Sequence, residues 1–252
     1  MFLLRDAPAR TTQSLVLPDG TVVEVLRVRD ARARRLRLIV SERGVRLTLP
    51  RRASERSGDA FLDEHRPWIA AQLAKRAAIA PLPALLPGQC EQLMLRGESV
   101  PVMWKEGRLA CAALGAHGIE ICAPANADPR RLKAALRELL LAEARSDVGR
   151  WLPRYLPDLP RPPSQLRVRP LQSLWGSLSP SAVLSLDLSL LLGRPSAFEY
   201  VLVHELCHLL HANHSKAFWR EVEARWPQWR DERDYLRGEG LNLKATLRAL
   251  VG

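Results

Sequence analysis

Short stretches in which apolar and polar residues alternate predict β-strands in the first fifty residues. The alternation runs through residues 21–25, 36–40 and 45–49. A period of two places Arg37 and Arg46 on the solvent face of a small sheet and their apolar neighbours on the opposite face. Further stretches of this kind lie between residues 91 and 123. We therefore expect the N-terminal half of the chain to be rich in β-structure.

Apolar residues spaced three and four apart predict helices. One helix is expected near residues 54–78, and its inward-facing side chains would be Phe61, Leu62, Trp68, Ile69 and Leu73. Another begins at Asp128-Pro129, where an acidic N-cap residue precedes a proline at the first helical position, and it extends to about residue 149.

The segment before residue 200 combines a strand pattern with a helix start. Leucines alternate with polar residues from 184 to 190, which predicts a half-buried strand. Ser196 and Glu199 have the spacing of a capping box, which predicts a helix beginning at Ser196. Together the patterns predict strands and helices arranged in two parts of the chain. Residues 1–125 would form a β-rich N-terminal lobe with a helix near 54–78, and residues 126–252 a second domain.

Composition agrees with a folded chain and shows where its charge lies. The 252 residues are 47% hydrophobic and 26% charged, which excludes a disordered or low-complexity protein. The net charge is +11, and residues 27–56 hold eleven arginines against three acidic residues. This basic patch 27–56 either binds a polyanion such as nucleic acid or is simply the solvated face of the sheet.

We expect a cytoplasmic protein that does not enter a membrane. No apolar run approaches the roughly 18 residues that a spanning helix needs. The four cysteines form no C-x-x-C pair, so neither a zinc knuckle nor a disulfide framework is predicted.

Four of the six histidines lie within eleven residues, and three residues of this cluster form the motif H-E-x-x-H. His204 and His208 are four apart, so on a helix both imidazoles lie on one face and can bind one tetrahedral metal ion. Glu205 lies one position further round the helix, where it can act on a water molecule at the metal. The motif predicts a zinc site with Glu205 as the catalytic residue.

The third metal ligand is predicted from distance along the helix. His211 is seven residues beyond His204, a rise of about 10.5 Å, whereas nitrogens on one zinc ion are roughly 3.4 Å apart. His214 can reach the metal if the helix ends near His211 and the chain turns back. A carboxylate from Glu221 or Glu223 is the rival ligand.

Three neutral imidazoles would leave a zinc ion its full charge and an open position, which lowers the pKa of a bound water to about 7. Glu205 would accept the proton of that water and return it to the leaving group. A donor to the developing oxyanion is also expected, and Trp175, Tyr200 and Arg169 are the candidates for this role or for contact with substrate.

Several motifs resemble the YgjP-like metallopeptidase family, which is related to SprT-like zincins. They are Trp175-Gly176-Ser177, the segment 199–208 around H-E-x-x-H, residues 213–219 and, upstream, residues 34–38 and 44–50. The resemblance covers roughly residues 20–238. It implies a zincin-like α+β metallopeptidase domain with an edge strand over the metal helix, zinc ligands His204, His208 and His214, and Glu205 as general base. Leu178 stands where the family usually has cysteine, and Asp187 where it has asparagine.

These observations favour a zinc-dependent metallopeptidase that acts on a peptide or protein substrate, with the substrate paired to a strand between residues 175 and 190. Two alternatives remain. One is a DNA-associated SprT-like protease that uses the basic patch 27–56 as its platform. The other is a zinc-dependent nucleoside triphosphate hydrolase whose arginines hold the phosphates. The sequence leaves the oligomeric state open.

Overall fold

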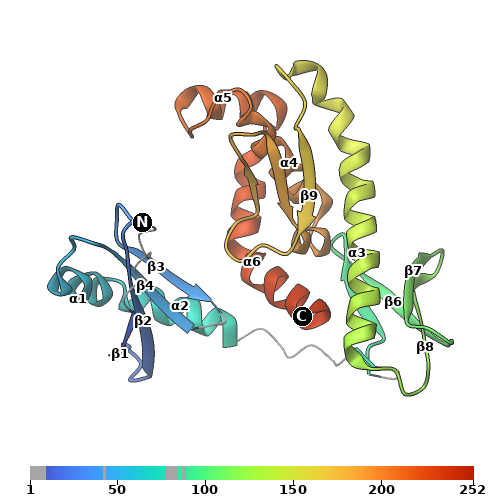
Figure 1. Cartoon of the computed structure of the whole chain (residues 1–252), viewed down its shortest axis with the longest axis horizontal. Helices are drawn as coiled ribbons and strands as arrows, with labels where there is room; N and C mark the ends of the chain where they lie inside the picture. Colours follow the sequence, from blue (N-terminus) through green and yellow to red (C-terminus); the bar gives the residue numbers. More distant parts are fainter. Residues whose placement is uncertain (1–9, 42–43, 78–84, 87–88) are drawn as a thin grey trace, which may run out of the picture. The chain divides into compact units, whose positions relative to one another are not determined.

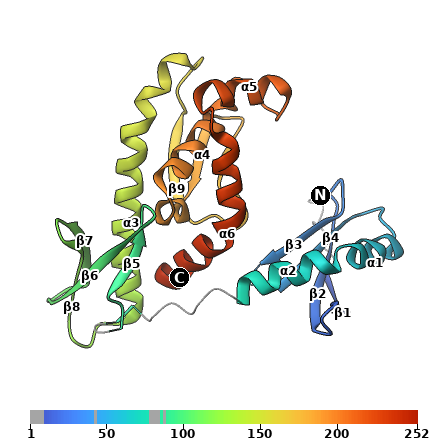
Figure 2. The same cartoon turned by 180° about the vertical axis from the view of Figure 1, so that it is seen from behind.

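Figures 1 and 2 show the protein as a computed structural model, which describes residues 10–41, 44–77, 85–86 and 89–252. Contacts divide the chain into two compact units, Met1–Ala80 and Pro81–Gly252. This boundary falls earlier than the predicted one between residues 125 and 126. Both units combine helices with sheets, and the first is rich in β-structure, so the predicted α+β class with a β-rich N-terminal lobe is confirmed.

The first unit is built on a four-stranded sheet. Its strands are β1 (Arg10–Val16), β2 (Val22–Asp30), β3 (Arg37–Ser41) and β4 (Gly44–Pro50), in the order β1-β2-β4-β3. The central pair β2 and β4 is parallel, and the outer pairs are antiparallel. The period-two pattern is confirmed in the first part of β4, where Val45 and Leu47 are buried and Arg46 is exposed, but not at Thr48, which alternation places on the solvent face and which is buried.

Two helices cover one face of this sheet, α1 (Glu55–Glu64) and α2 (Arg66–Ala77). The sequence predicted one helix over this stretch, but α1 ends at a C-cap residue, His65, just before Pro67. Leu62 and Ile69 are fully buried in the core of the unit, as predicted, whereas the Trp68 side chain is 42% exposed. Residue 78, the predicted end of the helix, lies outside the described residues.

Some arginines of the basic patch 27–56 form ion pairs within the first unit. Arg27 is only 7% exposed and bonds to Glu55 at 2.7 Å and to Asp59 at 2.5 Å. Arg29 pairs with Glu55 as well. Both arginines belong to the predicted patch of positive charge. In the structure they form ion pairs with acidic residues of α1 and hold this helix against the sheet. Arg37 and Arg46 are exposed.

A second four-stranded sheet opens the second unit. Its strands are β5 (Gln92–Leu95), β6 (Glu98–Glu106), β7 (Cys111–Gly115) and β8 (Gly118–Ala123), in the order β5-β6-β8-β7. Ile119 and Ile121 of β8 belong to the same apolar core as Leu136 and Leu140 of the long helix α3 (Pro129–Trp151). This shared core explains why the sheet joins the second unit and not the first.

Helix α3 joins the second sheet to the rest of the second unit. It begins as predicted, with the Asp128 side chain accepting a hydrogen bond from the Arg130 amide at 2.9 Å, and it ends at Trp151. Near its C-terminal end, the buried Asp147 accepts two hydrogen bonds of 2.9 Å from Arg96 at the β5–β6 turn. These bonds fasten the second sheet to α3.

Two short 3-10 turns follow α3, η1 (Leu152–Arg154) and η2 (Leu156–Asp158). They lead into a three-stranded sheet, one strand of which lies next to the helix with the histidine cluster. Its strands are β9 (Gln165–Arg169), β10 (Gly176–Leu178) and β11 (Val183–Asp187), in the order β10-β11-β9. The predicted strand 184–190 is shorter than expected, because residues 188–192 form the 3-10 turn η3 (Leu188–Leu192). It is also buried on both faces from Leu184 to Asp187.

Three helices complete the unit: α4 (Pro195–Cys207), α5 (Lys216–Arg225) and α6 (Trp229–Val251). Helix α4 begins one residue earlier than predicted, and no capping box forms. Glu199 instead accepts a hydrogen bond of 2.8 Å from the Tyr155 hydroxyl. Among the described residues, no helix is both long and apolar enough to cross a membrane.

Candidate metal centre

Helix α4 carries the H-E-x-x-H motif into the interior and then stops. Nearly every residue from Ala197 to Cys207 is buried, so the apolar side chains fix the helix in the core. The helix ends at Cys207, and His208 is its C-cap residue. This end lies earlier than the predicted one near His211, because the amides of residues 208–210 already bond to carbonyls three residues back. The early end brings the chain round to Ser215, the N-cap of α5.

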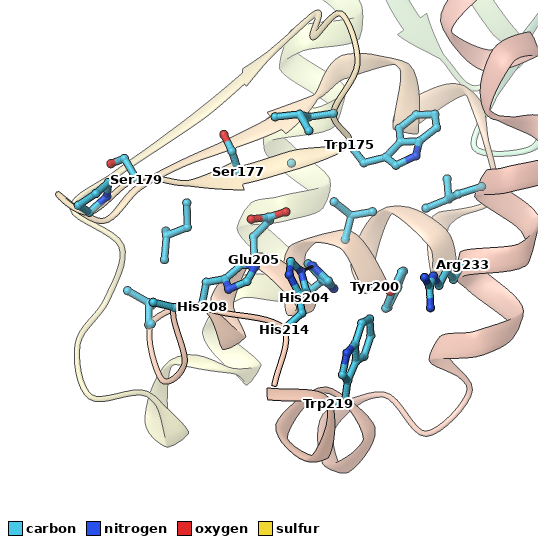
Figure 3. A pocket seen from close by; sticks show the side chains of 18 of the residues that line it. Trp175, Ser177, Ser179, Tyr200, His204, Glu205, His208, His214, Trp219 and Arg233 are labelled. Atoms are coloured by element: carbon cyan, nitrogen blue, oxygen red, sulfur yellow. Dashed lines mark hydrogen bonds between the residues drawn. The ribbon is translucent and has the colours of Figure 1, made fainter. Parts of the chain in front are cut away.

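The turn brings three imidazoles together (Figure 3). One ring nitrogen from each of His204, His208 and His214 lies within 4.8 Å of the others. The Nε2 atoms of His204 and His214 are 3.0 Å apart. His208 donates from Nδ1 to the carbonyl of His211 at 3.0 Å, when that nitrogen carries the proton, which leaves its Nε2 as the ligating atom. Three converging imidazoles fit the donor set and spacing of a zinc ion.

Aromatic side chains from α5 enclose the three rings. Phe218 is fully buried and stacks on His208 with ring centroids 4.5 Å apart. Its ring meets His204 edge to face at 5.0 Å and His214 at 4.8 Å. Because Phe218 contacts all three imidazoles, it restricts their orientation before any metal binds.

Burial keeps the imidazoles of His204 and His214 in the neutral form that binds metal. Burial lowers the pKa of His204 to about 3, with smaller contributions from the other two histidines and from Arg233. Burial also lowers the pKa of His214, and the charges of His208 and Arg233 lower it further. The Nδ1 atom of His204 is buried without a hydrogen-bond partner among the described residues. Neutral imidazoles are the ligating species, so the protein environment favours metal binding at neutral pH.

Glu205 occupies a narrow space between α4 and β10. The residue is 6% exposed, and burial raises the pKa of its carboxyl to about 7, partly offset by a hydrogen bond from the backbone of Leu178. A Cβ atom at Gly176 would lie 2.6 Å from Glu205 Cγ and 2.8 Å from its Oε1. Glycine at this position of the Trp-Gly-Ser segment therefore allows the carboxylate to approach the strand.

Strand β10 is an edge strand with backbone groups directed at the cleft. The Trp175 carbonyl accepts a bond of 2.8 Å from the Asp187 amide, and the Ser179 amide donates to Val183 at 3.0 Å. In an antiparallel pair the bonded residues alternate, so Gly176 and Leu178 turn their amides and carbonyls away from β11. These groups line the free edge above Glu205.

Asp187 and Lys244 hold the loop that precedes this edge. Asp187 is 1% exposed and forms an ion pair with Lys244, and it accepts a bond of 2.9 Å from the Leu171 amide. Lys244 also donates to the carbonyls of Leu171 and Leu174, and its ammonium lies 4.4 Å from the centre of the Trp175 ring. The acidic residue at position 187 is thus matched by a cation from α6.

A pocket of about 1220 Å³ contains the histidines and Glu205, and it separates the three candidates for the oxyanion donor. Trp175 and Tyr200 line the pocket, and Figure 3 shows both side chains there. Arg169 does not line it; it is exposed on β9, which β11 separates from β10. The expectation that Arg169 reaches the site fails for this topological reason.

The rival metal ligands lie elsewhere. Glu221 bonds to Arg225 at 2.6 Å and Glu223 to Arg230 at 2.9 Å, and neither lines the pocket. His211 is also absent from the lining and contributes its backbone carbonyl to His208. The arrangement therefore favours His214 over the carboxylates as the third ligand.

Comparison with known proteins identifies the family. A model of the YgjP-like metallopeptidase domain matches residues 34–239. The chain belongs to the YgjP-like metallopeptidase family. The crystal structure of the metallopeptidase zymogen of Pyrococcus abyssi abylysin is also similar, with 30% sequence identity over 39% of this chain and 90% of that chain and a TM-score of 0.29. The comparison with curated proteins found no significant match.

The sequence did not predict four residues that line the pocket of this metallopeptidase: Arg161, Trp219, Arg233 and Arg237. Trp219 stacks on Trp229 with centroids 4.3 Å apart and reaches the pocket from α5. The three arginines come from the η2–β9 connection and from α6. Their sequence positions carried no motif, because arginine is common along the whole chain and only the tertiary fold selects these three.

Proposed function

We propose that this protein is a zinc-dependent peptidase that binds the metal through His204, His208 and His214. The observation that carries the proposal is the convergence of three imidazoles beside the buried carboxyl of Glu205. A zinc ion bound there would supply a Lewis acid that polarises the scissile carbonyl and lowers the pKa of a coordinated water. Membership of a metallopeptidase family supports a peptide or protein substrate.

Glu205 acts as the general base. Its pKa of about 7 places it in the range where a carboxylate accepts a proton at neutral pH and releases it again. We propose that one carboxylate oxygen of Glu205 takes the proton of the attacking water and then delivers it to the nitrogen of the leaving amine. Gly176 and the backbone of Leu178 keep the carboxylate in place for both transfers.

The substrate binds as an added strand along β10. The outward-facing amide and carbonyl of Gly176 and the carbonyl of Leu178 are the pairing groups, while the Leu178 amide stays bonded to Glu205, and they position the scissile carbonyl above the histidines. An antiparallel arrangement matches the pairing that β10 already makes with β11. The extended substrate thereby excludes water from the cleft while it is held at the metal.

Tyr200 is the proposed oxyanion donor. It lies one helical turn before His204, with ring centroids 6.0 Å apart, and its side chain lines the pocket. Burial raises the pKa of its hydroxyl to about 12, so the proton is retained and can be donated in a hydrogen bond. The alternative donor, Trp175, is held in place by Lys244 and by close packing against Gly240.

The test compares wild type with Glu205→Gln after zinc in each protein has been quantified. We expect one zinc per chain in both proteins, peptide hydrolysis by wild type, and a loss of at least 100-fold in the variant. Nucleoside triphosphates are assayed in parallel. Wild type that takes up no metal, or that hydrolyses nucleotides but no peptides, would refute the proposed function.

A further inference from the structure

The pocket around the histidines carries an excess of positive charge. Its ionisable lining, apart from the histidines and Tyr200, consists of three arginines and one carboxyl group, Glu205. Arg237 has a partner, because it bonds to Asp234 at 3.0 Å. Arg161 and Arg233 form no ion pair within the described part of the chain. Two arginines of the lining therefore have no ion-pair partner among the described residues.

Ring contacts place Arg233 beside the histidines. It lies over Trp219, whose ring centroid is 5.7 Å from that of His204 and 5.8 Å from that of His214. Its guanidinium carbon lies 5.5 Å from the centre of the Trp219 ring and 5.9 Å from that of Trp229. Figure 3 shows Arg233 beside Tyr200 and Trp219, with its guanidinium at the pocket wall.

An unpaired cation is costly next to a site built for a metal cation. The like charges repel, and the indole rings of Trp219 and Trp229 offset only part of this energy. The position is favourable once an anion enters the pocket, because the guanidinium then forms two parallel hydrogen bonds to it. The charge pattern therefore points to a substrate that brings its own negative group.

The direction of β10 decides which side of the scissile bond meets Arg233. The strand runs from Trp175 to Ser179. The N-terminal end of an antiparallel substrate therefore lies near Ser179 and its C-terminal end near Trp175. Figure 3 places Arg233 and Trp175 at one end of the pocket and Ser179 at the other. The C-terminal part of the substrate accordingly runs toward Arg233.

On the basis of the proposed peptidase function, we propose that Arg233 binds a substrate carboxylate on the C-terminal side of the scissile bond. The carboxylate is either an aspartate or glutamate side chain or the free C-terminus of a short peptide. A nucleoside triphosphate fits less well, because the outward backbone groups of β10 match a peptide and not a nucleotide.

The test uses zinc-loaded protein and matched peptides. One set carries aspartate or glutamate at successive positions C-terminal to the cleaved bond, with asparagine or glutamine as neutral counterparts. A second set differs only in a free or amidated C-terminus. The variants are Arg233→Gln, Arg233→Lys and, as a control, Arg230→Gln. Arg230 is an exposed arginine of the same helix that pairs with Glu223 and does not line the pocket.

We expect wild type to prefer the acidic or free-terminus peptide by roughly 10- to 100-fold in kcat/KM, the range of a charged hydrogen bond. Arg233→Gln should remove this preference by lowering kcat/KM for the acidic or free-terminus peptide to the value for its neutral counterpart. Arg233→Lys should restore part of the preference, because the charge remains but the two-pronged geometry is lost. Arg230→Gln should behave as wild type. The first peptide set identifies a side-chain carboxylate and the second a terminal one.

A preference that is absent in wild type, or that survives Arg233→Gln, overturns the assignment even if peptides are cleaved. A preference confined to residues N-terminal to the cleaved bond overturns it as well. Failure to cleave any peptide would instead refute the proposed function. In that case, calorimetric titration of the Glu205→Gln protein with the same peptides decides on Arg233. Acidic peptides that bind at least tenfold tighter than neutral ones, only while Arg233 is present, support the assignment, and equal binding overturns it.

Discussion

Replacing Gly176 by alanine tests whether the position of the Glu205 carboxylate controls the reaction. The added Cβ atom would lie 2.6 Å from Glu205 Cγ and 3.0 Å from its Cδ. Carbon atoms in contact are ordinarily about 3.5–4.0 Å apart, so the carboxylate or the strand must move by about 1 Å. A displacement of this size at a catalytic group costs on the order of 100-fold in rate.

We therefore expect Gly176→Ala to lower kcat/KM for peptide hydrolysis by roughly 100-fold while the protein still binds one zinc ion. The three atoms nearest to the new methyl group all belong to Glu205, so we expect metal content and metal affinity not to change. The assay is steady-state hydrolysis of a quenched fluorescent peptide, with bound zinc measured on the same samples.

Gly238→Ala is the matched control. Gly238 lies in α6, and a Cβ atom there would meet nothing within 4 Å. This variant should keep full activity and gain up to about 1 kcal/mol in stability from its higher helix propensity. Full activity of Gly176→Ala at unchanged zinc content would refute the reasoning, because the carboxylate would then tolerate the displacement.

Three further predictions concern the metal, pH and the support of the loop before β10. His214→Ala should abolish stoichiometric zinc binding, whereas His211→Ala should retain it, since only its backbone carbonyl bonds to His208; atomic absorption distinguishes the two. The metal-free Glu205→Gln protein should lose stability as pH falls below 6.5, because the unfolded chain binds a proton that folded His204, with a pKa of about 3, does not bind; the substitution removes the carboxyl whose raised pKa of about 7 acts in the opposite direction, and equal urea midpoints at pH 7.5 and pH 5 would contradict this. Lys244→Met should lower the free energy of unfolding by about 3 kcal/mol, since it leaves buried Asp187 without its partner, and adding Asp187→Asn should recover part of the loss. A double variant as unstable as the single one would argue against the pairing.

The histidine cluster could be predicted from sequence because its spacing follows from helix geometry. His204 and His208 share a helical face wherever the helix lies, and the rise along the helix excludes His211. The end of the helix was harder to place. It depends on hydrogen bonds made by residues 208–210 at the C-terminus of α4, and these follow no sequence pattern as strong as the motif itself.

The sequence could not predict which residues reach the pocket through tertiary contacts. By sequence, Arg169 and Tyr200 were equal candidates for the oxyanion donor. The strand order, with β11 between β9 and β10, keeps Arg169 out of the pocket. Arg233 lies 29 positions after His204 and reaches the site because α6 packs against α4. The charge of residues 27–56 was also misjudged in part, since Arg27 pairs internally with Glu55 and Asp59. Binding of nucleic acid by this patch stays a prediction.

Asp187 illustrates how a departure from the family pattern can be explained by the fold. An acid at this position, buried to 1% exposure, would be unfavourable alone. Lys244 from α6 supplies the compensating charge, although it is 57 residues away in the sequence. Single-sequence reasoning has no means of pairing two residues at this separation.

The most direct test of the central claim is a crystal structure of the zinc-loaded protein with anomalous scattering recorded at the zinc absorption edge. We predict one peak about 2.0–2.1 Å from the Nε2 atoms of His204, His208 and His214. Glu205 should lie beside the metal without binding it. A peak bound by Glu221 or Glu223 in place of His214, or no peak among these histidines, would contradict the account.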